Sequence, residues 1–430
     1  MVAAVMLAGS TVVACNMVTD TLALMVSLVV KKQPRPERRV KNTALILSGG
    51  GARAAYQVGV LKAISEMLPK SAHNPFGIIC GTSAGALNAT AIAAHAARFR
   101  AGVLGLESIW RNLRAEQVYR TDIASISQRS LKWMGALFMG RHSSVPPISL
   151  LDNQPLRELI GRVIHFGRIA EGIEQGDLRA LSITASGYAT GESVSFYQGA
   201  PDIRPWRRRS RRLGVPTILG PEHLMASSAI PVVFPAVRIG SQYFGDGSVR
   251  QLAPISPALH LGADRVLVIG VSASNEIQPP TPHAEYPSVA QILGHMLNSA
   301  FVDSLEGDVE RLERINRTLD LIPEERQREA SLRRVNVLNI TPSQPLDAIS
   351  GRHVRELPRS LRLFLRGSGA TEHSGSAMLS YLLFAEGYCR ELITLGYHDA
   401  MRRERQILHF LGYEATVHLD AADLPAHDIC

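Results

Sequence analysis

Apolar residues between positions 43 and 99 follow two alternating patterns. Residues 43–49 (TALILSG) and 76–81 (FGIICG) are short apolar runs, typical of strands covered on both faces of a sheet. Between these runs, apolar residues recur at the three- and four-residue steps of a buried helix face. They are Val58, Leu61, Ile64 and Leu68. Helices are therefore predicted over 54–68 and 86–99, and the alternating order indicates an α/β fold with a mainly parallel sheet.

More strands are predicted further along the chain. Three segments are rich in β-branched and aromatic residues over the length of a strand. They are 180–186 (ALSITAS), 193–198 (SVSFYQ) and 265–272 (RVLVIGVS). Residues 237–249 (VRIGSQYFGDGSV) predict a hairpin that turns at Gly240 and Ser241. A short helix is predicted over 255–263, before the last strand.

The composition changes at the proline-rich segment 275–287, which marks a boundary. Helical spacing resumes over 292–312, and a single strand-like segment follows at 335–340 (VNVLNI). Further helices are predicted near 354–366 and 376–411. We therefore divide the chain into three parts. They are an apolar and basic N-terminal segment (1–42), an α/β domain (43–275) and a mostly helical C-terminal region (276–430).

The overall composition is that of a globular protein. With 430 residues and 46% hydrophobic residues the chain can fill sizeable cores, so disorder of the whole is excluded. No solenoid repeat, heptad array or collagen period is present. The four cysteines are scattered, with neither CxxC pairs nor zinc-ligand spacing. Neither a disulfide framework nor a metal or other cofactor is predicted, and a reducing compartment is favoured.

The N-terminal segment predicts a membrane anchor or a surface helix. Residues 1–30 are mostly apolar, and the basic stretch 31–41 (KKQPRPERRVK) follows. Asn16 and Asp20 interrupt the apolar run, which a spanning helix disfavours. A lipoprotein box at 12–15 (VVAC) is the weaker alternative, because no basic residue precedes it. If the segment spans a membrane, the basic stretch keeps the following domain on the cytoplasmic side, so a cytoplasmic or membrane-associated location is expected.

The net charge of +8 is compatible with an anionic membrane surface, nucleic acid or simple solubility. A second basic run at 204–212 (RPWRRRSRR) places Trp206 among six arginines. This run is either a solvated surface loop or a contact for phospholipid headgroups. No zinc finger, RNA-binding signature or basic zipper accompanies it, so nucleic acid is not predicted as a partner.

The sequence GTSAG at 81–85 contains the most informative serine of the chain. Ser83 falls at a predicted strand-to-helix turn, where a sharp bend lifts the hydroxyl above the sheet and the small residues Gly81 and Gly85 avoid clashes. The helix N-terminus behind it stabilises developing negative charge. From these residues alone, Ser83 is either a nucleophile or part of a structural turn.

A second glycine turn, Gly49-Gly50-Gly51-Ala52-Arg53, follows the first predicted strand. Consecutive glycines let backbone N–H groups converge on one point as an anion cradle, which a tetrahedral oxyanion needs. A nucleotide loop is the rival, although the GK[ST] of a P-loop is missing and the spacing is not GxGxxG. A plain structural turn is the third alternative.

A serine nucleophile also needs a base, and spacing alone leaves three candidates. Asp246 lies at a predicted strand end between Gly245 and Gly247, where a tight backbone holds a carboxylate exposed. His260 and His295 fit the chain order of α/β-hydrolases.

Three ordered blocks resemble the patatin-like phospholipase family. They are 47–64 (LSGGGARAAYQVGVLKAI), 81–89 (GTSAGALNA), and 226–237 (ASSAIPVVFPAV) with 246–250 (DGSVR). The resemblance covers about residues 43–275, and a softer likeness to long bacterial members extends to 380–400. It implies a three-layer sandwich with a mainly parallel central sheet, followed by a helical C-terminal region. The sequence departs from the family pattern at two positions: Ala54 stands where Gly is usual, and Ser248 stands where Gly or Ala is usual.

The resemblance also implies a catalytic dyad that needs no histidine. Ser83 would be the nucleophile and Asp246 its base, with an oxyanion hole from Gly50, Gly51 and Ala52. The implied supporting residues are Gly49, Arg53, Gly81, Gly85 and Gly247.

The implied function is that of a hydrolase in lipid degradation, which cleaves fatty-acyl esters of phospholipids or lysophospholipids through an acyl-serine. The expected partners are the lipid substrate and an anionic membrane surface, whereas the oligomeric state is not predicted. Two alternatives remain at this point. One is an esterase or thioesterase for soluble acyl esters, and the other is an idle lipid-binding scaffold.

Overall fold

The computed structural model describes most of the chain from Asn42 onward. The described residues are 42–121, 149–206, 210–251, 253–273, 288–300, 304–323, 326, 332–367 and 376–413. They belong to one compact unit. The predicted anchor and basic stretch within 1–41, and the proline-rich boundary at 275–287, lie outside the described residues.

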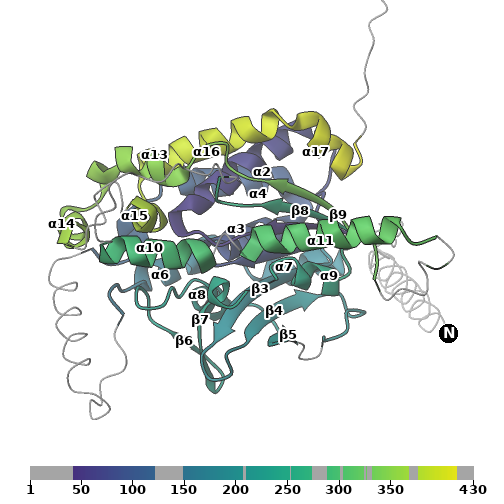
Figure 1. Cartoon of the computed structure of the whole chain (residues 1–430), viewed down its shortest axis with the longest axis horizontal. Coiled ribbons are helices and arrows are strands. Elements are labelled where there is room, and N and C mark those ends of the chain that lie inside the picture. Colours follow the sequence, from purple (N-terminus) through teal and green to yellow (C-terminus); the bar gives the residue numbers. More distant parts are fainter. Residues whose placement is uncertain are drawn as a thin grey trace, which may run out of the picture. The chain divides into compact units, whose positions relative to one another are not determined.

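A nine-stranded mixed sheet lies at the centre of this unit (Figure 1). Its main path is β5-β4-β3-β2-β1-β8-β9, and β7 pairs with both β3 and β6. The strands are β1 (Thr43–Leu47), β2 (Ile78–Thr82), β3 (Ala180–Gly187), β4 (Ser193–Gly199), β5 (Arg212–Pro216), β6 (Val237–Ile239), β7 (Gln242–Asp246), β8 (Arg265–Ile269) and β9 (Asn336–Ile340). Neighbours from β3 through β2, β1 and β8 to β9 pair in parallel, whereas β4 and β7 run antiparallel to β3. The prediction of a mainly parallel sheet is confirmed.

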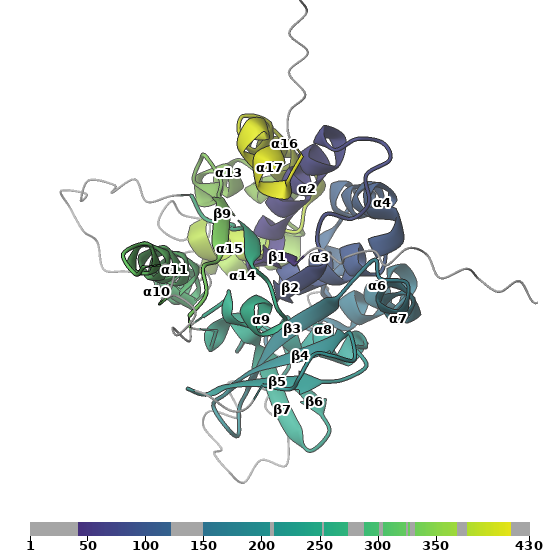
Figure 2. The same ribbon diagram turned by 90° about the vertical axis from the view of Figure 1, so that its right-hand side faces the viewer.

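Alternate side chains of β1 point into two different helical layers. Leu45 and Leu47 belong to the apolar cluster formed with α2, α3, α4 and α16, whereas Ala44 and Ile46 belong to the cluster formed with α9 and α11. Figure 2 shows these helices on opposite sides of the sheet. The helices of the α/β region are α2 (Ala55–Met67), α3 (Ala84–Ala93), α4 (Phe99–Arg111), α6 (Gln154–Val163), α7 (Gly167–Glu174), α8 (Pro221–Ser227) and α9 (Ser256–His260). The predicted three-layer sandwich is confirmed.

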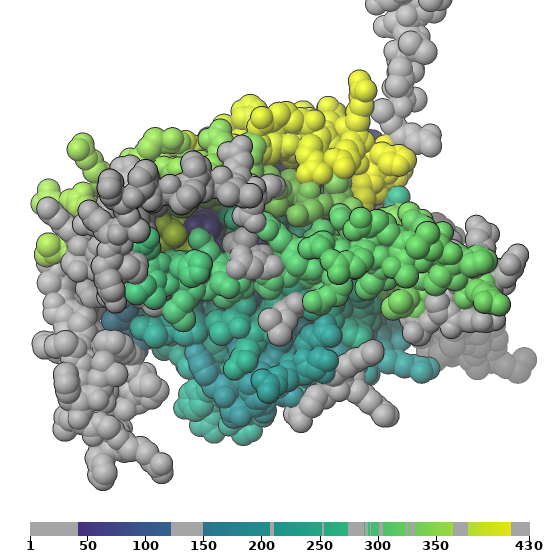
Figure 3. Space-filling view, in the orientation of Figure 1, coloured from purple at the N-terminus to yellow at the C-terminus, as the bar shows by residue number. Residues whose placement is uncertain are grey.

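The C-terminal part adds helices and one strand to this framework. Its helices are α10 (Val289–Asn298), α11 (Ser304–Asp320), α13 (Leu346–Arg352), α14 (Arg359–Gly367), α15 (Ser376–Leu382), α16 (Glu386–Met401) and α17 (Glu404–Leu411). In Figure 3 the green surface of α10 and α11 crosses the molecule between the yellow C-terminal helices and the teal strands. The predicted helical region is therefore present, and the division of the chain at about residue 275 stays a prediction.

Helices α2 and α16 approach so closely that their backbones touch. A Cβ added at Gly59 would lie 2.0 Å from the carbonyl oxygen of Ile393, and one added at Gly396 would lie 2.1 Å from that of Tyr56. Since β9 also extends the sheet beside β8, the C-terminal region is joined to the α/β core through both a helix and a strand.

Two predicted helices differ from the structure. The helix expected over 86–99 ends at Ala93, and α4 starts a new direction at Phe99. The break depends on a tertiary contact, because His95 fits against Gly102 of α4, where an added Cβ would lie 2.6 Å from the His95 Cβ. The helix expected over 292–312 is divided in two: α10 ends at Asn298 and α11 begins at Ser304.

Candidate active site

Ser83 occupies a sharp turn between β2 and α3. It is the N-cap residue of α3, with φ 54° and ψ −132°, and only 2% of it is exposed. A non-glycine residue with positive φ is strained, and such strain is typical of a nucleophile elbow. The flanking glycines make the turn sterically possible. An added Cβ at Gly85 would lie 2.3 Å from the Leu47 carbonyl oxygen, and one at Gly81 would lie 2.6 Å from the Ala86 Cα.

The sheet topology brings Asp246 to the end of the strand that precedes Ser83. β2 pairs with β3 as far as Thr82, opposite Thr184, and β7 pairs with the next residue of β3, where Ala185 faces Asp246. Because β4 covers the other edge of β3, β2 and β7 share one edge and meet end to end. The two candidate dyad residues, far apart in sequence, therefore lie at the same point.

The expectation that Asp246 is held exposed is wrong, because the end of β7 packs beneath the Ser83 turn; its carboxyl is fully buried and only partly hydrogen-bonded. Its backbone N–H donates to the Ala229 carbonyl at 2.8 Å, and its Oδ1 accepts from the Ser248 N–H at 2.9 Å. Burial raises the pKa of Asp246 to about 6, although interactions with the Ser83 side chain and with Ser248 lower it. Oδ2 has no well-aligned hydrogen-bond partner within the described residues. Ser83 is thus close enough to affect this carboxyl electrostatically, while the geometry leaves Oδ2 open as a proton acceptor.

The glycine turn after β1 faces the same cavity as Ser83. Gly51 has φ +55°, and an added Cβ would lie 2.1 Å from the Tyr381 carbonyl oxygen. The Arg53 N–H donates to the Gly50 carbonyl at 3.1 Å and closes the turn into a short 3-10 helix, Gly51–Ala54. The first amides of a helix lack acceptors within it, so this turn presents N–H groups that an oxyanion can use.

The Arg53 side chain is directed to the C-terminal helices. It is 4% exposed, and its Nε donates to Ser380 Oγ at 2.7 Å. Nη1 donates to Asn298 Oδ1 at 3.2 Å. No carboxylate pairs with it among the described residues. Arg53 therefore places a positive charge without a carboxylate partner, among the described residues, near the glycine turn, and it connects that turn to α10 and α15.

Neither alternative base lies at Ser83. The His260 ring stacks on Trp206 with 4.9 Å between centroids. This pair packs against the helical layer of α9 and α11, on the opposite side of the sheet from α3. His295 is exposed on α10. Trp206, from the basic run, is thus packed inward, while residues 207–209 of that run lie outside the described part of the chain.

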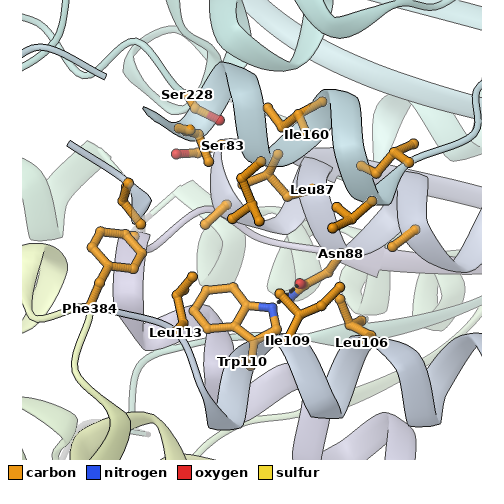
Figure 4. Close-up of a pocket in the computed structure, with 18 of the residues that line it drawn as sticks. Ser83, Leu87, Asn88, Leu106, Ile109, Trp110, Leu113, Ile160, Ser228 and Phe384 are labelled. Carbon is orange, nitrogen blue, oxygen red and sulfur yellow. Dashed lines mark hydrogen bonds between the residues drawn. The ribbon is translucent and has the colours of Figure 1, made fainter. Parts of the chain in front are cut away.

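An apolar cavity of about 240 Å³ extends from Ser83 between α3, α4 and α6. Its lining is mostly aliphatic and aromatic. It includes Leu87, Ala91, Leu106, Ile109, Trp110, Leu113, Leu156, Ile160, Val163, Ile230, Phe234 and Phe384. In Figure 4, Ser83 and Ser228 lie at one end of the labelled residues and Leu106 at the other. Small residues of α3 leave room for this cavity at Ala84 and Ala91.

Asn88 is a buried polar residue in the cavity wall that the sequence did not single out. Its Oδ1 accepts from Trp110 Nε1 at 2.8 Å, and its Nδ2 donates to the Ala54 carbonyl at 3.1 Å and to Gln57 Oε1 at 3.0 Å. Asn88 therefore ties α3 to α2 and α4. The only sequence signal was a lone Asn within a run of small apolar residues.

Ser227 is the second polar residue that sequence reasoning missed. Its Oγ accepts from the Ser83 N–H at 2.9 Å and donates to the Thr184 carbonyl at 2.6 Å. It therefore fixes the backbone of the Ser83 turn to β3. Ser227 lies in the 226–237 block that carried the family resemblance, which was the available signal.

Comparison with known proteins identifies the family of this α/β chain. The sequence model described as patatin-like phospholipase matches residues 45–259, half of the chain. The chain belongs to the patatin-like phospholipase family, a family of lipid-hydrolysing enzymes. The sequence prediction of this family is confirmed.

Three individual proteins similar to this chain each share about a quarter or less of their aligned residues with it. The chain is 26% identical over 217 residues to a cGAMP-activated phospholipase of Pseudomonas aeruginosa, covering 50% of this chain and 55% of the relative. The chain thus spans about half the length of that relative. Among solved structures, VipD from Legionella pneumophila is 12% identical with a TM-score of 0.33, covering 89% of this chain and 73% of VipD. The type III effector ExoU is 13% identical with a TM-score of 0.25, over 79% and 76% of the two chains.

The described residues contain neither a membrane-spanning helix nor a metal-binding cluster. No helix there combines the length and the apolar run needed to cross a membrane. No group of three or more His, Cys, Asp or Glu side chains there is arranged to hold a metal ion.

Proposed function

We propose that this protein is a serine acyl hydrolase that cleaves fatty-acyl esters of phospholipids or lysophospholipids through a Ser83–Asp246 dyad. The observation that carries the proposal is the buried Asp246 carboxyl, with an open Oδ2, beside a strained serine at the end of an apolar cavity. A pKa of about 6 leaves this carboxyl ionised at neutral pH, yet far more basic than an ordinary aspartate.

The reaction then proceeds in two halves. Asp246 takes the Ser83 proton as Oγ attacks the ester carbonyl carbon, and the N–H groups of Gly50, Gly51 and Ala52 stabilise the oxyanion. The tetrahedral intermediate collapses, and Asp246 returns the proton to the departing alcohol oxygen. Water then attacks the acyl-serine carbonyl while Asp246 takes its proton; the bond to Ser83 Oγ breaks, Asp246 returns the proton to Oγ, and the fatty acid leaves.

The cavity supports a long acyl chain as the substrate group. Ala91 lies eight residues from Ser83, about 12 Å at the rise of an α-helix. An extended acyl chain lengthens by about 3.6 Å for every three bonds, so about 12 Å of cavity holds roughly ten carbons. Apolar walls of this extent favour a lipid over a small soluble ester. An anionic membrane surface remains the proposed place of action, supported by the net charge of +8.

The proposal is tested by fatty-acid release from phosphatidylglycerol and phosphatidylcholine vesicles, with EDTA present. Ser83→Ala and Asp246→Asn are expected to abolish release, whereas Ser108→Ala, an exposed serine on α4, is expected to retain it. A fluorophosphonate probe is expected to label the wild type and not Ser83→Ala. Release that persists in Ser83→Ala contradicts the dyad. A folded wild type that is labelled but releases nothing from vesicles favours a soluble-ester enzyme.

A further inference from the structure

The short segment from Ser227 to Ala229 holds both proposed dyad residues. The Ser227 hydroxyl accepts from the Ser83 N–H at 2.9 Å, and the Ala229 carbonyl accepts from the Asp246 N–H at 2.8 Å. Ser228 lies between these two anchors, and it lines the cavity together with Ser83. The hydrogen bonds that position the proposed dyad therefore also fix the location of Ser228 in the structure.

The Ser228 hydroxyl is buried without a hydrogen-bond partner. The residue is 6% exposed, and its Oγ has no acceptor or donor among the described residues. The backbone, in contrast, is satisfied, because its N–H donates to the Leu224 carbonyl at 3.0 Å and its carbonyl accepts from the Ile230 N–H at 3.0 Å. A buried hydroxyl without a partner destabilises a folded protein, so packing alone would favour alanine at this position.

Two other polar side chains in the cavity wall, Asn88 and His95, are paired. Asn88 uses both ends of its amide, and His95 Nδ1 lies 2.9 Å from the Ala91 carbonyl. Ser228 differs from them because its partner is missing at the end of the cavity where an ester would bind. Figure 4 shows Ser228 and Ser83 at that end.

We propose that Ser228 donates a hydrogen bond to the bridging ester oxygen of the bound substrate, the atom that leaves with the alcohol. This inference rests on the proposed function. Asp246 must protonate that oxygen, so the oxygen lies near the segment that anchors Asp246. As the carbon–oxygen bond breaks, negative charge develops on the leaving oxygen, and the Ser228 hydroxyl stabilises it until the proton arrives from Asp246. The carbonyl oxygen is held separately, by the glycine turn.

The test compares two esters that carry the same acyl chain. One has an alkyl alcohol, which is a poor leaving group, and the other has 4-nitrophenol, a good one. Ser228→Ala is expected to lower kcat/KM about tenfold for the alkyl ester, as one lost charge-assisted hydrogen bond does, and less than about twofold for the nitrophenyl ester. Its melting temperature is expected to equal or exceed that of the wild type, because the lost hydroxyl had no partner.

The neighbouring serine provides the matched control. Ser227→Ala removes two hydrogen bonds, so it is expected to lower the melting temperature and to reduce kcat/KM for both esters alike. Three results for Ser228→Ala would overturn the inference: wild-type activity on both esters, an equal loss on both, or a loss with a lower melting temperature. A folded wild type that hydrolyses neither ester and is not labelled by fluorophosphonate overturns the proposed function, and the role of Ser228 with it.

Discussion

The guanidinium of Arg53 stacks over the ring of Tyr381, with 4.1 Å from its central carbon to the ring centroid. The two residues are 328 positions apart in the chain. Tyr381 contacts the same turn a second time, because its carbonyl oxygen lies against Gly51. Helix α15 therefore supports the proposed oxyanion turn from outside the α/β region.

Substitution of Tyr381 separates these contacts. Tyr381→Phe keeps the ring but loses the hydroxyl, which accepts from Arg53 Nη1 at 3.4 Å and donates to Asn298 Oδ1 at 2.8 Å. We expect the free energy of unfolding to fall by about 1–3 kcal/mol, as for two lost hydrogen bonds. Tyr381→Ala also empties a fully buried site and is expected to cost about 3–5 kcal/mol. Urea denaturation measures both, and equal losses in the two variants would contradict a role for the ring.

The pH dependence of activity should follow the buried carboxyl. Asp246 must be ionised to act as a base, and its pKa is raised to about 6. We expect kcat/KM for a soluble ester to rise with pH and to reach half of its plateau near pH 6. An ordinary aspartate would give a midpoint near pH 4. A midpoint at that lower value would show that burial does not control the base.

The same shift makes a prediction for stability. Folding favours the protonated form of Asp246, so its contribution is complete below about pH 4 and is lost as pH rises through about 6. Asp246→Asn keeps the shape and removes the charge. At pH 8 it should therefore be more stable than the wild type by about 2–3 kcal/mol, from 1.36 kcal/mol per pKa unit, and the difference should vanish near pH 4.

Chemical denaturation at both pH values tests this prediction. Asp320→Asn, which removes an exposed ion pair with Arg334 at the end of α11, serves as control and is expected to change stability by less than about 1 kcal/mol. An Asp246→Asn variant that is less stable than the wild type at pH 8 would mean that the ionised carboxyl has a stabilising partner.

The distance of Gly105 from the start of α3 can be inferred from two contacts between α3 and α4. Trp110 of α4 bonds to Asn88 of α3, and Gly102 of α4 packs against His95 beyond the end of α3. Gly105 lies between these two contacts and lines the cavity. Interpolation between them places it about 12 Å from the start of α3.

Gly105→Leu is expected to shorten the acyl chain that the cavity accepts. An added Cβ there meets no atom within 4 Å, so a larger side chain fits and extends into the open space. We expect kcat/KM to fall about tenfold for a sixteen-carbon ester, which corresponds to about 1.4 kcal/mol. An eight-carbon ester is expected to react as before, because its chain ends before Gly105. Gly161→Leu on α6 is the matched control, because it also meets no atom but does not line the cavity. Equal chain-length profiles in both variants would contradict this path for the chain.

Local patterns in the sequence determined the strands and helices of the α/β core and the two glycine turns. The run TALIL predicted β1, because a strand buried on both faces is a short continuous apolar run, and the three- and four-residue spacing of apolar residues after it predicted α2. GTSAG placed Ser83 at a strand-to-helix turn for the same reason. The break at His95 left no such signature, since it depends on contact with another helix.

Residue spacing could not place Asp246, rather than His260, beside Ser83; the family resemblance implied that choice, and the tertiary structure gives its physical reason. Spacing left these candidates equal, because distance along a chain does not say which strand occupies which edge of a sheet. The edge of β3 beyond the end of β2 is filled by β7, and this pairing brings the carboxyl to the serine while His260 packs on the other face. The contacts of Ser227 and Tyr381 with the site, and the place of Ser228 in the cavity wall, are equally non-local. They arise from packing between segments far apart in the sequence, 144 positions for Ser227 and Ser83 and 328 for Tyr381 and Arg53, which no local pattern of side chains encodes.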